Sequence, residues 1–151
     1  MKKNNEMKVE FLSKSVNEGF ARCVVASFAS QLDPTIEELS DIKTAVSEAV
    51  TNSIIHAYPN VEGIIKVTGR IIDNQIEIDV SDNGVGIENV EKAKEPLYTT
   101  KGNLERSGMG FAIMENFMDD LNVESIVGLG TKISMRKKIK KYIFEETKFT
   151  D

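Results

Sequence analysis

Cysteine is almost absent from this sequence, and so is any long run of apolar residues. Cys23 is the single cysteine, so the chain cannot form an internal disulfide or a cysteine cluster for zinc. No apolar run approaches the roughly 20 residues of a membrane-spanning helix, and Lys2-Lys3 is followed by polar residues rather than by an apolar stretch. We therefore expect a protein of the reducing cytoplasm.

Positive charge is also in short supply. The chain has 19 lysines and arginines against 24 aspartates and glutamates, a net charge of −5. This balance argues against a general affinity for nucleic acid and favours a protein partner or a small ligand. The length of 151 residues fits one domain with little left over for a second.

Several familiar phosphate-binding signatures are missing. There is no GxxxxGK[ST] sequence, no complete dinucleotide fingerprint, and neither an HRD nor a DFG tripeptide. These absences exclude a eukaryotic-type protein kinase. A nucleotide site in this chain has to be built in another way.

The hydrophobic pattern predicts alternating strands and helices. Two capping-box patterns, Ser15 to Glu18 and Thr35 to Glu38, predict the starts of the first two helices, and Pro59 predicts the end of the second. The expected elements are a strand at 7–11, helices at 15–32 and 35–58, strands at 64–72 and 75–81, a short helix at 90–94, a helix at 110–118, and strands at 122–126 and 132–135. This order predicts an α+β fold, a two-layer α/β sandwich with helices on one face of a mixed, mainly antiparallel sheet.

Three polar residues recur at one-turn intervals on the second predicted helix. Glu48, Asn52 and His56 fall on one side of it. A carboxylate one turn from a carboxamide offers a base and a neutral oxygen ligand to the same small volume, and Mg²⁺ takes oxygen ligands while keeping several waters. An ordinary solvated helix face is the alternative.

Three glycine-containing segments follow. Asp82-Asn83-Gly84-Val85-Gly86 comes directly after a predicted strand, where a carboxylate can accept a hydrogen bond from an exocyclic amine. Ser107-Gly108-Met109-Gly110 opens a predicted helix, whose unpaired amides suit phosphate oxygens. Gly130-Thr131 stands at the start of a strand. Taken singly, these segments are equally consistent with tight turns and loop glycines.

In this order, the four segments resemble the ATP-binding domain shared by gyrase, Hsp90, histidine kinases and MutL, the GHKL superfamily. The resemblance implies a Bergerat fold with ATP between the helices and a flexible lid from about Ile87 to Ser107. At matching positions it implies that Glu48 is the general base, Asn52 the Mg²⁺ ligand and Asp82 the carboxylate that reads adenine. The other residues for which it implies nucleotide contacts are Gly84, Gly86, Thr99, Thr100, Lys101, Ser107, Gly108, Met109, Gly110 and Thr131.

The segment from Glu95 to Asp120 narrows the resemblance to the bacterial anti-sigma factor serine kinases, the sporulation members above all. This resemblance extends from about Met7 to Lys137, so we expect an ATP-binding domain over 1–137 and a charged tail over 138–151. It implies a cytoplasmic homodimer that binds and inhibits a sporulation sigma factor. It also implies that the protein uses ATP and Mg²⁺ to phosphorylate a serine of an anti-anti-sigma factor.

Some residue roles and alternatives stay open at this stage. Arg106 either balances charge on the transferring phosphoryl group or is an exposed lid charge. Glu18 and Arg22, four residues apart on the first helix, are either a partner-docking pair or an ordinary surface ion pair. A non-catalytic ATP-dependent sigma-factor clamp and a simple ATPase are the alternative functions. Glu48 argues against the clamp, but the same base would serve serine or water.

Overall fold

The computed structural model describes residues 4–95 and 110–140. In these residues the strands are β1 (Asn5–Leu12), β2 (Ile64–Ile72), β3 (Gln75–Asp82), β4 (Asp120–Ile126) and β5 (Gly130–Lys138). The helices are α1 (Asn17–Ala29), α2 (Ile36–His56), α3 (Val90–Ala93) and α4 (Gly110–Phe117), with a 3₁₀ turn at Ser30–Leu32. Every predicted element is therefore present, with its ends shifted by a few residues.

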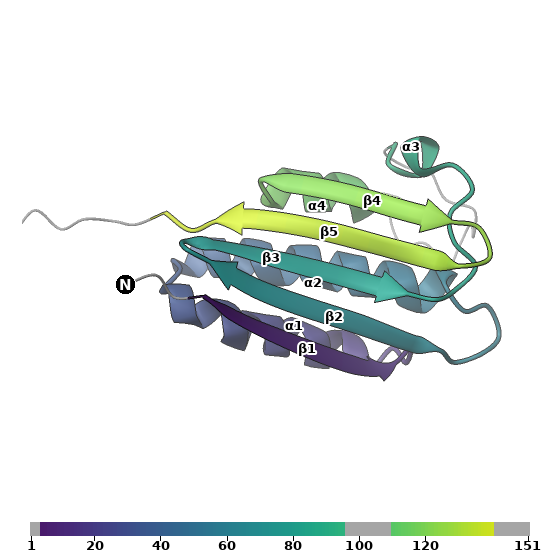
Figure 1. Ribbon diagram of the computed structural model, residues 1–151, viewed down its shortest axis with the longest axis horizontal. Helices are drawn as coiled ribbons and strands as arrows, with labels where there is room; N and C mark the ends of the chain where they lie inside the picture. Colours follow the sequence, from purple (N-terminus) through teal and green to yellow (C-terminus); the bar gives the residue numbers. More distant parts are fainter. Residues whose placement is uncertain (1–3, 96–109, 141–151) are drawn as a thin grey trace, which may run out of the picture.

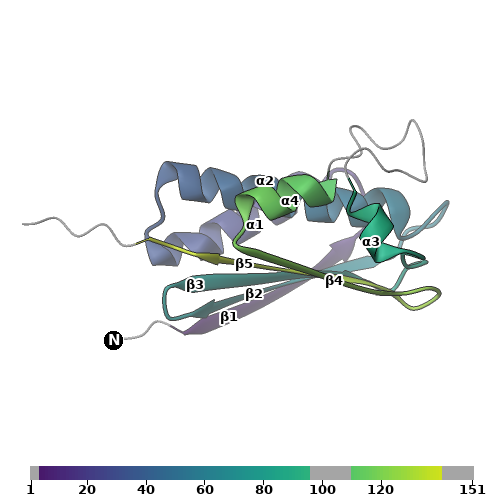
Figure 2. The same ribbon diagram turned by 90° about the horizontal axis from the view of Figure 1, so that it is seen from above.

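The strands form one sheet in the order β1-β2-β3-β5-β4 (Figure 1). Helices α1, α2 and α4 all lie on the same side of it (Figure 2). The predicted two-layer α+β architecture is thus confirmed. All four strand pairings are antiparallel, so the described part of the chain contains no parallel pair where we expected a mixed sheet.

The core lies between the sheet and the helices. Along α2, Ile42, Val46, Ala49 and Val50 are fully buried, as the helical spacing of apolar residues predicts. From the sheet they meet the inward-facing residues of every second position, which are Ile65, Val67, Ile76, Ile78, Val80, Ile133 and Met135. This packing fixes the rotation of α2, and with it the direction in which Glu48 and Asn52 face.

The starts of the two long helices differ in how they are capped. At Thr35 the predicted capping box is confirmed, because the Glu38 amide donates to the Thr35 hydroxyl at 3.0 Å and the Thr35 amide donates to Glu38 Oε1 at 2.9 Å. The prediction of a capping box at Ser15 is wrong. Helix α1 begins later, with Val16 at the cap position and no side-chain cap bond. The Glu18 amide bonds the Ser15 backbone carbonyl instead of the hydroxyl.

Glu38 has a second role besides capping. Its other oxygen, Oε2, accepts a hydrogen bond from the Lys140 amide at 2.9 Å, although the two residues are 102 positions apart. The carboxylate therefore joins the start of α2 to the chain just after β5. Burial raises the pKa of this carboxyl, but hydrogen bonds from Thr35 and Lys140 and the charge of Lys137 lower it by more, so the pKa lies below its ordinary value of 4.5.

We expect Glu38→Gln to lower the free energy of unfolding by about 1 kcal/mol at pH 7, because an amide group would turn a donor toward the Lys140 or Thr35 amide. A carboxyl with a lowered pKa in the folded state stabilises the fold above the unfolded-state pKa, and this contribution is lost as the pH falls through the folded-state pKa. In urea denaturation, the difference between wild type and variant should therefore shrink below about pH 4.5. Glu37→Gln, at an exposed position on the same turn, is the control. A difference that does not change with pH would contradict this account.

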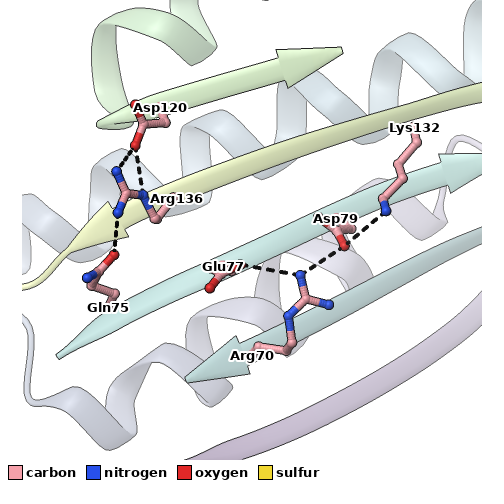
Figure 3. Close-up of polar contacts among 7 residues, drawn as sticks. All are labelled: Arg70, Gln75, Glu77, Asp79, Asp120, Lys132 and Arg136. Carbon is pink, nitrogen blue, oxygen red and sulfur yellow. Dashed lines mark hydrogen bonds and ion pairs between the residues drawn. The ribbon is translucent and has the colours of Figure 1, made fainter. Parts of the chain in front are cut away.

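The face of the sheet opposite the helices is polar (Figure 3). Arg70 Nη2 lies 3.2 Å from Asp79 Oδ2 and 3.4 Å from Glu77 Oε1, and Lys132 Nζ lies 3.8 Å from Asp79 Oδ2. Arg136 bonds Asp120 on β4. These cross-strand pairs keep the open face of the sheet charged, so the apolar core is confined to the helical side.

The end of the described chain remains packed on the domain. Ile139 is 1% exposed, and its amide bonds the Asn74 carbonyl at 2.8 Å. The packed structure therefore reaches into the segment 138–151 that we expected to be a charged tail, and the part after Lys140 lies outside the described residues. Among the described helices, none has both the length and the apolar character needed to cross a membrane.

Candidate functional site

Asp82 is a buried carboxylate at the last position of β3. Its side chain accepts three hydrogen bonds: from the Ser53 hydroxyl to Oδ2 at 3.0 Å, and from the Gly84 and Thr131 amides to Oδ1 at 3.0 and 3.3 Å. The residue is 8% exposed. Three donors, from α2, the following loop and β5, fix the carboxylate in one orientation.

The two glycines after Asp82 are required by the fold itself. A β-carbon on Gly84 would overlap the carbonyl of Ala57 at the end of α2, and that carbonyl accepts from the Val85 amide at 2.8 Å. Gly86 has φ +80°, a backbone conformation that residues with a side chain rarely adopt. These observations explain both glycines by packing and backbone conformation, and their contact with a nucleotide stays a prediction.

Thr131 lies directly opposite Asp82 on the neighbouring strand, because the register of β3 and β5 pairs the two residues. Its hydroxyl lies 2.8 Å from that of Ser125 on β4, and the Ser125 hydroxyl also accepts from the Ile87 amide at 2.6 Å. The sequence prediction did not include Ser125. This polar cluster joins the loop after β3 to the hairpin of β4 and β5, and it holds Thr131 beside the carboxylate.

Glu48 and Asn52 lie one turn apart on α2, and both are half-buried. A β-carbon on Gly110, the first residue of α4, would lie 3.4 Å from Glu48 Oε2. The carboxylate of Glu48 is therefore at the start of α4, as the sequence prediction of a shared site for these two segments requires. His56, one further turn along α2, is also half-buried.

Asn52, the predicted Mg²⁺ ligand, is judged by whether its side-chain oxygen suits the ion. Groups of three or more acidic, histidine or cysteine side chains that could hold a metal are absent from residues 4–95 and 110–140. Mg²⁺ at a nucleotide site needs only one or two protein oxygens, because phosphates and waters complete its shell. The amide oxygen of Asn52, one turn from the Glu48 carboxylate, fits this donor set.

The predicted residues that lie outside the described parts of the chain are Thr99, Thr100, Lys101, Arg106, Ser107, Gly108 and Met109. Of the expected lid, the first part is described and contains α3, whose start is capped by Asn89 through a 3.0 Å bond from the Lys92 amide. Lys94 joins this helix to α4 through an ion pair with Glu115 at 3.4 Å.

Ser53 contacts the carboxylate of Asp82, and the sequence analysis did not include it among the candidate site residues. It occupies the buried side of α2, where the helical pattern places apolar residues, and it is 4% exposed. A hydroxyl in an otherwise apolar stripe was the available signal, since buried hydroxyls are nearly always hydrogen-bonded. Its partner, 29 residues away on β3, could not be read from local spacing.

Comparisons with known proteins show the family of this chain. Residues 13–137 match the histidine kinase-like ATPase domain family. An anti-sigma F factor of Clostridium acetobutylicum is 60% identical over 134 residues, covering 89% of this chain and 94% of the relative. An anti-sigma F factor of Caldanaerobacter subterraneus subsp. tengcongensis is 63% identical over 139 residues, covering 92% and 97%.

A solved structure supports the fold. The crystal structure of the RsbU and RsbW domains of a Mycobacterium tuberculosis protein superposes with a TM-score of 0.64 at 16% identity. The match covers 89% of this chain and 32% of that longer one. With the family match over most of the chain and relatives of 60% identity and more, the chain belongs to the histidine kinase-like ATPase family and, within it, to the anti-sigma F factors.

Proposed function

We propose that this protein is an anti-sigma factor that binds a sporulation sigma factor and uses ATP with Mg²⁺ to phosphorylate a serine of an anti-anti-sigma factor. The observation that carries the proposal is the position of the Glu48 carboxylate beside Gly110 at the start of α4. Helix starts suit phosphate oxygens, so this carboxylate lies where an acceptor hydroxyl would meet a terminal phosphate. Asp82, held by three donors, supplies the group that would bind adenine.

The residues divide the chemistry among them. Glu48 takes the proton of the acceptor serine as that oxygen bonds to the γ-phosphorus and the bond to the ADP leaving group breaks. The proton then leaves Glu48 for solvent. Asn52 would hold Mg²⁺, which would supply positive charge to the phosphates. Arg106 in the predicted lid balances charge on the transferring group, with Lys101 as a second cation.

The deciding experiment mixes the full-length protein with ATP labelled at the γ-phosphate and a purified anti-anti-sigma factor from the same organism. We expect acid-stable phosphoserine on the partner. Release of labelled inorganic phosphate without phosphoserine would show that the protein is an ATPase and not a protein kinase. Tight ATP and sigma-factor binding with neither product would favour a non-catalytic clamp.

We further propose that the protein acts as a cytoplasmic homodimer, in which the ATP-binding domain predicted over 1–137 is extended by the packed residues up to Lys140 and followed by the rest of the charged segment 138–151. The resemblance to the bacterial anti-sigma factor serine kinases supports both the location and the dimer. A protein that holds a sigma factor away from RNA polymerase acts in the cytoplasm. Sedimentation equilibrium should give twice the mass of the 16.8 kDa chain. A monomer at micromolar concentration would contradict it.

The proposed docking surface for the sigma factor is the start of α1. Arg22 Nη1 lies 3.2 Å from Glu18 Oε1, and the Arg22 side chain is 41% exposed. Two large apolar residues at the start of the same helix are also exposed, Val16 at 77% and Phe20 at 47%, although their helical positions are on a different side of α1 from Glu18 and Arg22. Arginine is enriched at interface hot spots, and an arginine exposed at 41% is accessible to a partner, which supports a docking role for this pair.

We expect Arg22→Ala to weaken sigma-factor binding by ~10-fold or more, the loss of about 1.4 kcal/mol or more that truncating an interface arginine causes. Its affinity for ATP should stay at the wild-type value, because α1 contributes no residue to the proposed nucleotide site. Arg136→Ala is a matched control, since Arg136 is also ion-paired but lies on the open face of the sheet. Surface plasmon resonance with immobilised sigma factor measures both. Equal affinities of Arg22→Ala and wild type would identify Glu18 and Arg22 as an ordinary surface pair.

A further inference from the structure

The hydroxyl of Ser53 reaches out of α2 to the carboxylate of Asp82. A serine within a helix can bond the carbonyl four residues earlier in its own helix. Here Ser53 Oγ instead donates to Asp82 Oδ2 at 3.0 Å, and both residues are buried, at 4% and 8% exposure. The bond therefore connects the helix that carries Glu48 and Asn52 with the strand end that carries the proposed base-reading group.

The hydrogen bonds that Asp82 already accepts leave few acceptor positions open to a ligand. A carboxylate offers about four lone-pair sites, two on each oxygen. The Gly84 and Thr131 amides occupy those of Oδ1, and the Ser53 hydroxyl occupies one of Oδ2. One acceptor position remains, on Oδ2, and its direction is set by the bond from Ser53.

The other side of the carboxylate is fixed independently of Ser53. Thr131 is held by the register of β3 and β5 and by the contact between its hydroxyl and that of Ser125. The Gly84 amide is held by the close packing of Gly84 against Ala57. Removing the Ser53 hydroxyl would therefore release Oδ2 while leaving Oδ1 in place.

We propose that Ser53 is a positioning residue that sets the nucleobase preference of the site, by aiming the remaining acceptor position of Asp82 Oδ2 at the 6-amino group of a purine. This inference rests on the proposed function, in which Asp82 reads adenine. Without the hydroxyl, Oδ2 has two open acceptor positions with no fixed direction, and water competes with the amine for them. Ser53 thus acts on the nucleotide only through Asp82.

The test compares two nucleotides that differ by the amino group alone. Purine riboside 5′-triphosphate has the ring, ribose and phosphates of ATP but carries no 6-amino group. In calorimetry with Mg²⁺ we expect Ser53→Ala to weaken ATP binding by ~10-fold and to change the binding of the analogue by about 2-fold at most. The preference of the protein for ATP over the analogue should fall accordingly, and Ser53→Thr, which keeps a hydroxyl, should recover most of it.

Ser47 provides the matched control on the same helix. Its hydroxyl is buried and has no hydrogen-bond partner among the described residues, so Ser47→Ala should leave both affinities unchanged. Equal weakening of ATP and analogue by Ser53→Ala would show a merely structural bond and overturn the inference, as would an unchanged preference. Wild-type protein that binds ATP and the analogue equally would instead overturn the adenine-reading role of Asp82, and the inference with it.

Discussion

Replacing Glu48 by Gln should slow phosphotransfer to the anti-anti-sigma factor by ~10² to 10⁴-fold, the usual contribution of a general base. Glutamine keeps the shape of the side chain beside Gly110 and removes its ability to take a proton. Because the proton moves only as the new bond forms, the loss should appear in the rate of the bound complex. Affinities for ATP and for the sigma factor should change little. Single-turnover assays with labelled ATP measure the rate directly.

Two further variants separate the role of Glu48 from general effects on the site. Glu115→Gln removes a carboxylate from α4 that is half-exposed and paired with Lys94, so it should leave phosphotransfer at the wild-type rate. Asn52→Ala should lose Mg²⁺-dependent nucleotide binding as well as activity, because it removes the proposed protein ligand of the ion. Wild-type phosphotransfer by Glu48→Gln would show that Glu48 is not the base and would favour the clamp.

The elements of this fold could be predicted because each has its own local signal. In α2 the apolar spacing, the capping box at Thr35 and the proline after Tyr58 all agree, and the helix runs from Ile36 to His56. The first helix carried a weaker signal. A second capping-box pattern, Ser-x-x-Glu, occurs at Ser15, but there the backbone carbonyl accepts the bond and the helix begins at Asn17. A capping pattern alone therefore does not fix the start of a helix.

The assembly of the candidate site depends on pairings that no local pattern encodes. Asp82 and Thr131 are 49 residues apart, and they meet because β5 pairs with β3 rather than only with its hairpin partner β4. The sequence identified both residues through the resemblance and could not show that they touch. Ser53 was missed for a related reason, since it lies on the apolar side of α2 and its partner Asp82 is 29 residues away. Glycines 84 and 86 were predicted as ligand contacts, and the structure adds a packing requirement for each.

The second large effect is expected at Asp82. Asp82→Asn should weaken ATP binding by ~30 to 150-fold, equivalent to about 2 to 3 kcal/mol for a hydrogen bond to a charged group. The amide oxygen of asparagine can replace Oδ1 and accept from the Gly84 and Thr131 amides. Its amide nitrogen then occupies the place of Oδ2 and donates. The Ser53 hydroxyl can rotate to accept that bond, whereas the 6-amino group of adenine would meet a second donor. Isothermal calorimetry with ATP and Mg²⁺ measures the affinity.

Asp79→Asn is the matched control for this prediction. Asp79 is on the same strand and is buried to the same degree, but it faces the open side of the sheet, where it pairs with Arg70 and Lys132. Its replacement changes the same charge on β3 and should leave ATP affinity unchanged, even where thermal unfolding shows a loss of stability. If Asp82→Asn binds ATP with wild-type affinity, the carboxylate does not read adenine. If Asp79→Asn weakens binding as much as Asp82→Asn, the effect comes from the sheet as a whole, and the three hydrogen bonds on Asp82 serve only the fold.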